Sequence, residues 1–184
     1  MKKLKLFSMF LFAAFTAVFS ACAGGSTADE PSMQDFLQRT NEASKVVCTT
    51  TLSAGEFTLA EESAIYERDE SGAQLTHALT TLSSEILNES MYETVTTTAA
   101  VTETDFELAA ALPFDASAAN AETDGDTLVL QAADPTAFFG SENAASFTDV
   151  TATVRLENER PVSCLITFSL EDGCFVTIVY AYSY

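Results

Sequence analysis

The chain has 184 residues and no tryptophan, and its 27 acidic side chains outnumber the eight basic ones. The formal net charge of −19 argues against nucleic acid as a partner, because phosphate would be repelled, and against a domain that lies flat on anionic lipids. The length suits a single domain with a sizeable core that needs no disulfide to fold.

The first 25 residues have the pattern of an export signal. Three lysines precede an apolar run from Leu6 to Ala21, and Cys22 follows it directly. The segment resembles a bacterial lipoprotein signal, although Phe19 stands where leucine is usual. This resemblance implies that Cys22 carries acyl chains such as palmitate and becomes the first mature residue. The protein would then be lipid-anchored on the extracytoplasmic face of a cell membrane.

Two alternatives to the lipoprotein interpretation are a retained membrane anchor and simple secretion. The apolar run has about 16 residues, whereas a spanning helix needs roughly 20. Ordinary cleavage after a small-x-small site would remove Cys22. Under the lipoprotein interpretation, residues 1–21 are the signal peptide, 22–30 are the acylated cysteine and a flexible tether, and 31–184 form a single β-rich domain.

Residues 31–44 are predicted to form an amphipathic helix, with a proline at the first position. Its apolar face consists of Met33, Phe36, Leu37 and Thr40. Segment 45–53 is a predicted strand because Val and Thr favour extended backbone. Segment 57–67 is predicted from its weak alternation, and 74–82 is the next predicted strand.

The middle of the chain is harder to interpret. Over 83–116 the only signal is a short helix, in which Thr104 and Glu107 have the spacing of a capping box and Pro113 ends the segment. Residues 122–125 are expected to form a loop and 127–133 a strand. Asp134 then begins a one-turn helix that Gly140 ends.

The last third shows alternating apolar residues typical of an antiparallel meander. A three-residue loop at 171–173 pairs Leu170 with Cys174 and Phe168 with Val176, which keeps all even-numbered residues on one apolar face. We therefore predict an α+β fold that is mainly antiparallel β. It consists of a single curved sheet whose concave face holds the N-terminal amphipathic helix and short helices.

This order of elements resembles the lipoprotein-carrier fold, a curved half-barrel sheet with helices in its concave face. The resemblance implies an apolar cavity between helix and sheet, which in that family holds acyl chains. The alternatives are a closed core and an immunoglobulin-like sandwich of two sheets.

The cysteines after Cys22 lie in a compartment where disulfides can persist. The meander register separates Cys164 from Cys174 by roughly 20 Å, beyond the reach of a disulfide. We predict that these two are not bonded, that any disulfide involves Cys48, and that a free thiol on the apolar face is buried and slow to react.

Few residues suggest chemistry. His77 is the single histidine and no nucleophile motif accompanies it, so no enzyme is expected. The cysteines and the acidic segment 122–126 lack the spacings of zinc and calcium sites, so we expect no metal and no cofactor.

The sequence therefore predicts a monomeric, non-enzymatic lipoprotein that binds a hydrophobic ligand, a lipidated partner or an envelope protein. Phe36, Tyr180 and Tyr182 are the candidate ligand-binding residues. The alternatives are a ligand-free accessory or regulatory module with a closed core, and an extracytoplasmic hydrolase.

Overall fold

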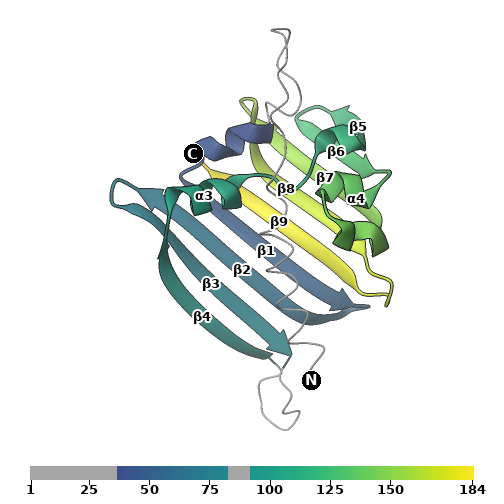
Figure 1. Ribbon diagram of the computed structural model, residues 1–184, viewed down its shortest axis with the longest axis horizontal. Coiled ribbons are helices and arrows are strands. Elements are labelled where there is room, and N and C mark those ends of the chain that lie inside the picture. The colour runs from purple at the N-terminus through teal and green to yellow at the C-terminus, as the bar shows by residue number, and fades with distance from the viewer. Residues whose placement is uncertain (1–36, 83–91) are drawn as a thin grey trace.

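The computed structural model describes residues 37–82 and 92–184 and contains one open, antiparallel sheet of nine strands (Figure 1). The strands lie in the order β4-β3-β2-β1-β9-β8-β7-β6-β5. Their bounds are β1 Lys45–Ala54, β2 Phe57–Asp69, β3 Gly72–Leu82, β4 Tyr92–Val101, β5 Ala119–Asp124, β6 Thr127–Ala132, β7 Thr148–Glu157, β8 Arg160–Ser169 and β9 Phe175–Ser183. The predicted single, mainly antiparallel sheet is confirmed for the described residues, and a two-sheet sandwich is excluded for them.

Short helices accompany the sheet. They are η1 (Arg39–Glu42), α3 (Glu103–Ala110), η2 (Ala116–Ala118), α4 (Pro135–Phe139) and η3 (Glu142–Ser146). Helices α3 and α4 lie on the same side of the sheet in Figure 1. We call this side the inner face and the opposite side the outer face. Within the described ranges, no helix is both long enough and apolar enough to cross a membrane.

The first and last strands, β1 and β9, pair in the middle of the sheet. They divide it into a half made of β1 to β4 and a half made of β5 to β9. The chain passes from one edge of the sheet to the other between β4 and β5, through α3 and η2. Helix α3 contacts β2 and β3 during this crossing.

The register of the C-terminal hairpin agrees with the sequence prediction. Phe168 pairs with Val176, and Cys164 pairs with Tyr180. All four side chains are buried on the inner face. The one-turn helix α4 is confirmed as well. Asp134 accepts hydrogen bonds from the helix N-terminus, and Gly140 ends the helix in the left-handed conformation with φ 60°.

Three predictions need correction. Strands β4 and β5 were missed, and the latter occupies part of the segment expected to be a loop. The capping box lies two residues earlier than predicted. Thr102 caps α3, and the Asp105 carboxylate accepts a hydrogen bond from the Thr102 backbone N–H at 3.0 Å.

The predicted helix over 31–44 lies partly outside the described residues. The described part turns from Leu37 to Glu42 and ends there, because Ala43 is extended. Leu37 and Thr40, two members of the predicted apolar face, are buried.

Candidate binding face

The inner face is tightly closed over the half of the sheet that contains β5 to β9. A cluster of phenylalanines packs α4 and its neighbouring segments against strand β8. Phe168 of β8 stacks on Phe147, with ring centroids 4.3 Å apart, and Phe138 of α4 stacks on Phe114 at 4.8 Å. Phe139 joins the two pairs through edge contacts with Phe138 and Phe168. Close aromatic packing of this kind leaves a sealed core in this half.

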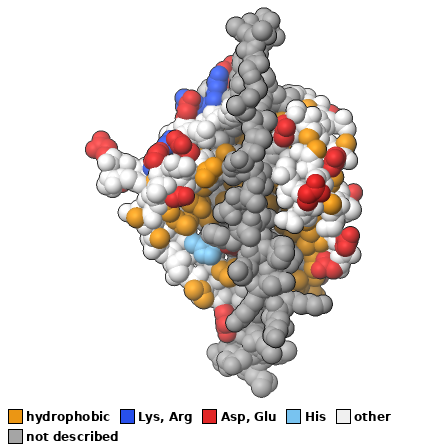
Figure 2. All heavy atoms as spheres, in the orientation of Figure 1, with side chains coloured by type: hydrophobic (Ala, Val, Ile, Leu, Met, Phe, Trp, Pro, Cys, Tyr) orange, Lys and Arg blue, Asp and Glu red, His pale blue; other side chains and the backbone are white. Residues whose placement is uncertain are grey.

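The other half of the inner face becomes steadily more exposed toward its edge. Val46 of β1 is fully buried, and Ala64 of β2 and Leu79 of β3 are only partly buried. Val95, opposite Leu79 on β4, is 65% exposed. Hydrophobic side chains are accordingly visible at the surface on this side of the molecule (Figure 2). An apolar strip thus remains incompletely covered on β2, β3 and β4.

Polar side chains interrupt the apolar strip: Glu93 and Thr97 flank Val95 on β4, and one pair lies between β2 and β3. His77 Nε2 lies 2.6 Å from Glu62 Oε1, and both side chains are largely shielded from solvent. Residue Glu62 belongs to β2 and His77 to β3, so the pair also bridges two strands. A carboxylate and an imidazole in contact can exchange hydrogen bonds with the polar end of a ligand.

A row of sulfur and phenol groups lies at the boundary between the two halves. Cys48 of β1 and Cys164 of β8 each pair directly with Tyr180 of β9. A hydrogen bond joins Cys48 to Tyr180, but burial is the larger effect and raises the pKa of the Cys48 thiol to about 11. Burial also raises the pKa of Cys164. Because two strand spacings separate the cysteines, about 10 Å, they cannot form a disulfide with each other.

All three described cysteines are free. This agrees with the prediction that Cys164 and Cys174 are not bonded to each other. Cys48, the predicted member of any disulfide, is also unbonded. The expectation that both meander thiols are buried holds only for Cys164. Cys174 lies in the loop before β9, which begins one residue later, and is partly exposed at the margin of the core.

The sequence-predicted binding residues do not form an exposed site. Tyr180 and Tyr182 are 2% and 6% exposed, and their rings stack on each other with centroids 6.1 Å apart. The hydroxyl of Tyr182 is buried and has no hydrogen-bond partner among the described residues. Both Phe36 and the lipidation candidate Cys22 lie outside the described residues. Alternation could locate the tyrosines on the apolar face but could not show how completely that face is covered.

The basic residues after Cys22 are all engaged in ion pairs. The five pairs join Arg39 to Glu159, Lys45 to Glu67, Arg68 to Glu103, Arg155 to Glu157 and Arg160 to Glu42. Since 27 acids face only these five cations, the domain surface is strongly negative. None of the described lysines and arginines remains unpaired to bind an anionic headgroup.

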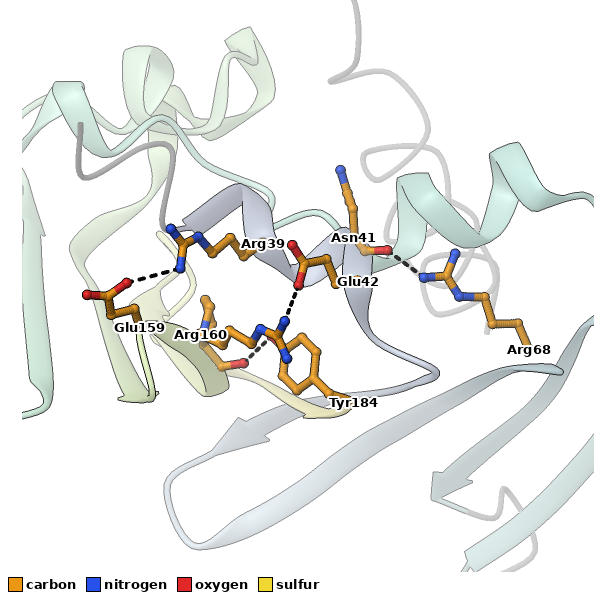
Figure 3. Close-up of polar contacts among 8 residues, drawn as sticks. Arg39, Asn41, Glu42, Arg68, Glu159, Arg160 and Tyr184 are labelled. Atoms are coloured by element: carbon orange, nitrogen blue, oxygen red, sulfur yellow. Dashed lines mark hydrogen bonds and ion pairs between the residues drawn. The ribbon is translucent and has the colours of Figure 1, made fainter. Parts of the chain in front are cut away.

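Three of these arginines gather where η1 meets the end of the sheet (Figure 3). Arg160 contacts Glu42 at 2.6 Å and lies over the ring of Tyr184. Arg68 donates to the carbonyl oxygen of Asn41 at 2.6 Å and lies 4.5 Å from the ring centroid of Phe106. These contacts hold η1 against the sheet. In the sequence, η1 lies after the predicted tether.

The acidic segment considered for calcium forms the end of β5 and the turn into β6. In the described part of the chain, no group of three or more His, Cys, Asp or Glu side chains is arranged to hold a metal ion.

The chain matches no protein-family model and no curated protein sequence.

Proposed function

We propose that this protein is a membrane-tethered, extracytoplasmic lipoprotein whose inner face binds a hydrophobic ligand or the apolar segment of an envelope partner. The observation that carries the proposal is the asymmetry of that face. One half is sealed by phenylalanines, while the strip containing Ala64, Leu79 and Val95 stays partly exposed. Apolar surface that a folded domain leaves accessible commonly marks a binding site.

The charge of the domain favours an apolar chain over an anionic headgroup as the element recognised. The strip contains the contacting pair Glu62 and His77, and every lysine and arginine of the described residues already has a carboxylate partner. Affinity would therefore come from burial of hydrocarbon, at about 25 cal/mol per Å². The likeness to lipoprotein carriers, which rests on the order of the elements, supports an acyl chain as the ligand.

Binding can be tested with a fluorescent fatty-acid probe and two variants at adjacent positions of β2. Ala64 faces the inner strip and Ser63 the outer face, because successive residues of a strand alternate. Ala64→Trp should fill the strip and weaken probe binding at least tenfold. The control, Ser63→Trp, should leave binding unchanged. Equal probe binding by both variants and the unaltered protein would exclude the inner strip as the site.

The membrane tether has its own test. Cys22→Ala should abolish acylation and release the protein into the soluble fraction, because only the acyl chains hold it on the bilayer. Membrane retention of this variant would favour a retained anchor. Failure of the probe to bind at all would favour the ligand-free accessory module. Ester turnover that depends on His77 would favour the hydrolase.

A further inference from the structure

The two edges of the sheet are built very differently. Edge strand β5 has six residues and carries Glu122 and Asp124. Edge strand β4 has ten residues, and Thr94 to Val101 contains no charge and no proline. Its pairing with β3 runs over all ten residues without a bulge. Short length, charges, prolines and bulges are the devices that keep a sheet edge from pairing with another strand. Strand β5 has two of them, whereas β4 has almost none.

Nearly every side chain of β4 is exposed, and among the described residues no strand lies beyond β4 at this edge. In an antiparallel pair, alternate residues direct their N–H and C=O groups away from the partner strand. Over residues 94–101, strand β4 therefore presents a row of backbone donors and acceptors that pair with no described strand, beside β-branched side chains, which suit extended pairing. We propose that β4 pairs with β4 of a second copy of this chain, in antiparallel orientation, to form a continuous sheet across a twofold axis. This proposal is independent of the ligand-binding proposal, because it concerns the edge and not the inner face.

The sequence of β4 is complementary to itself in this orientation. A twofold axis at Thr97 places Val95 opposite Ala99 on the inner face and Thr96 opposite Thr98 on the outer face. An axis at Thr96 places Thr94 opposite Thr98 and likewise keeps inner residues opposite inner ones. Cross-strand threonine pairs stabilise sheets, and this sheet already uses one between β3 and β4, where the Oγ1 atoms of Thr80 and Thr94 are 2.9 Å apart.

The two registers also separate the single charge of the strand from its copy. Glu93 falls opposite Val101 with the axis at Thr97, and opposite Ala99 with the axis at Thr96. Like charges directly opposite each other would destabilise the pair, and neither register creates such a contact. The net negative charge of each copy still opposes association at long range, and salt screens this repulsion.

Cysteine cross-linking in cells that make the full chain tests the proposal. Thr96→Cys and Thr97→Cys are each combined with Cys174→Ser, which removes the thiol in the loop before β9. A residue on the axis faces its own copy at about 5 Å between Cα atoms, within reach of a disulfide. We expect at least one of the two variants to give a band of twice the mass on a non-reducing gel. The fraction cross-linked should be at least ten times that of the controls.

Two controls carry the same Cys174→Ser change. Thr94→Cys lies on the same exposed edge but four or six residues from its copy, and Ala121→Cys lies on β5. The proposal is overturned if neither Thr96→Cys nor Thr97→Cys cross-links, or if the controls cross-link equally, which indicates random collision. A cross-linked band of another mass would assign the edge to a different protein and also overturn the second copy as its partner.

Discussion

At the scale of single residues, the buried hydroxyl of Tyr182 is the clearest unmet requirement of the fold. A buried polar group without a partner costs about 1–3 kcal/mol. Tyr182→Phe removes only this hydroxyl, so we predict unchanged stability or a gain of about 1 kcal/mol in the free energy of unfolding. Tyr180→Phe is the matched control, because Tyr180 is hydrogen bonded to Cys48, and it should cost about 0.5–1.5 kcal/mol. Urea denaturation measures both, and a larger loss for Tyr182→Phe would reveal a partner for its hydroxyl.

The largely shielded thiol of Cys48 predicts instability at alkaline pH. Burial raises its pKa from the ordinary 9.0 to about 11, and it also raises the pKa of Tyr180 and Tyr182. Below about pH 9 neither the folded nor the unfolded thiol is ionised, so stability there is unaffected. Between pH 9 and 11 the unfolded chain releases a proton that the folded domain retains. Unfolding therefore becomes more favourable as pH rises, by on the order of 2 kcal/mol from Cys48.

Thermal melts across pH 8 to 11 would show this loss. Cys48→Val should make the decline shallower. Cys174→Ser should have a smaller effect, since desolvation raises the pKa of this loop thiol by less than that of Cys48. A flat profile up to pH 11 would contradict the shielding of these groups.

At the scale of elements, the strands that the sequence did not reveal are the two edges of the sheet. Alternation of apolar and polar residues arises only where one face of a strand is buried and the other is not. Strands β8 and β9 satisfy this condition, so their register could be predicted to the residue. Strands β4 and β5 are exposed on both faces over nearly their whole length. Their composition therefore carries no period, and Thr-rich or acidic segments of this kind look like loops.

The junction of η1, α3 and β2 depends on Arg68. Its guanidinium contacts the Asn41 carbonyl oxygen, the Glu103 carboxylate and the Phe106 ring at the same time. A lysine cannot satisfy all three, because it lacks the planar fork of donors. We predict that Arg68→Ala lowers the free energy of unfolding by about 2–3 kcal/mol and that Arg68→Lys recovers less than half of this loss.

Arg155→Ala provides the comparison for that experiment. Its pair with Glu157 is well exposed on both sides, so its loss should be small. Hydrogen exchange should also rise at η1 and α3 in Arg68→Ala, since both elements lose an anchor. If Arg68→Lys recovered the whole loss in the free energy of unfolding, the positive charge alone would account for the stability of the junction.

At the scale of the whole molecule, the sequence predicted the single antiparallel sheet but not which part of its inner face is open. The alternation of β8 and β9 indicates the apolar face, and it therefore predicts Tyr180 and Tyr182 as binding residues. Which part of the inner face is covered depends instead on the path of the connection between β4 and β5. The segments after β4 bring Phe114, Phe138 and Phe147 over the C-terminal half and leave Val95 exposed. Contacts between segments this far apart in the chain cannot be derived from local periodicity.

The charge balance of the whole domain predicts that salt stabilises it. After Cys22, 27 acidic side chains face five basic ones, a net charge of −22. Salt weakens the five ion pairs, but exposed pairs contribute only about 0–1 kcal/mol each. It also screens the repulsion among the unpaired carboxylates, which extends over the entire surface. The second effect involves many more charges, so the urea midpoint should rise between 0.05 and 0.5 M NaCl.

Measuring the midpoint at two protein concentrations separates this effect from association, because a midpoint that depends on dimerisation shifts with concentration. A concentration-independent rise with salt would show that repulsion within each copy limits stability. A midpoint that falls with salt would mean that the ion pairs around η1 outweigh the repulsion. The arginine junction would then be the main electrostatic support of the fold.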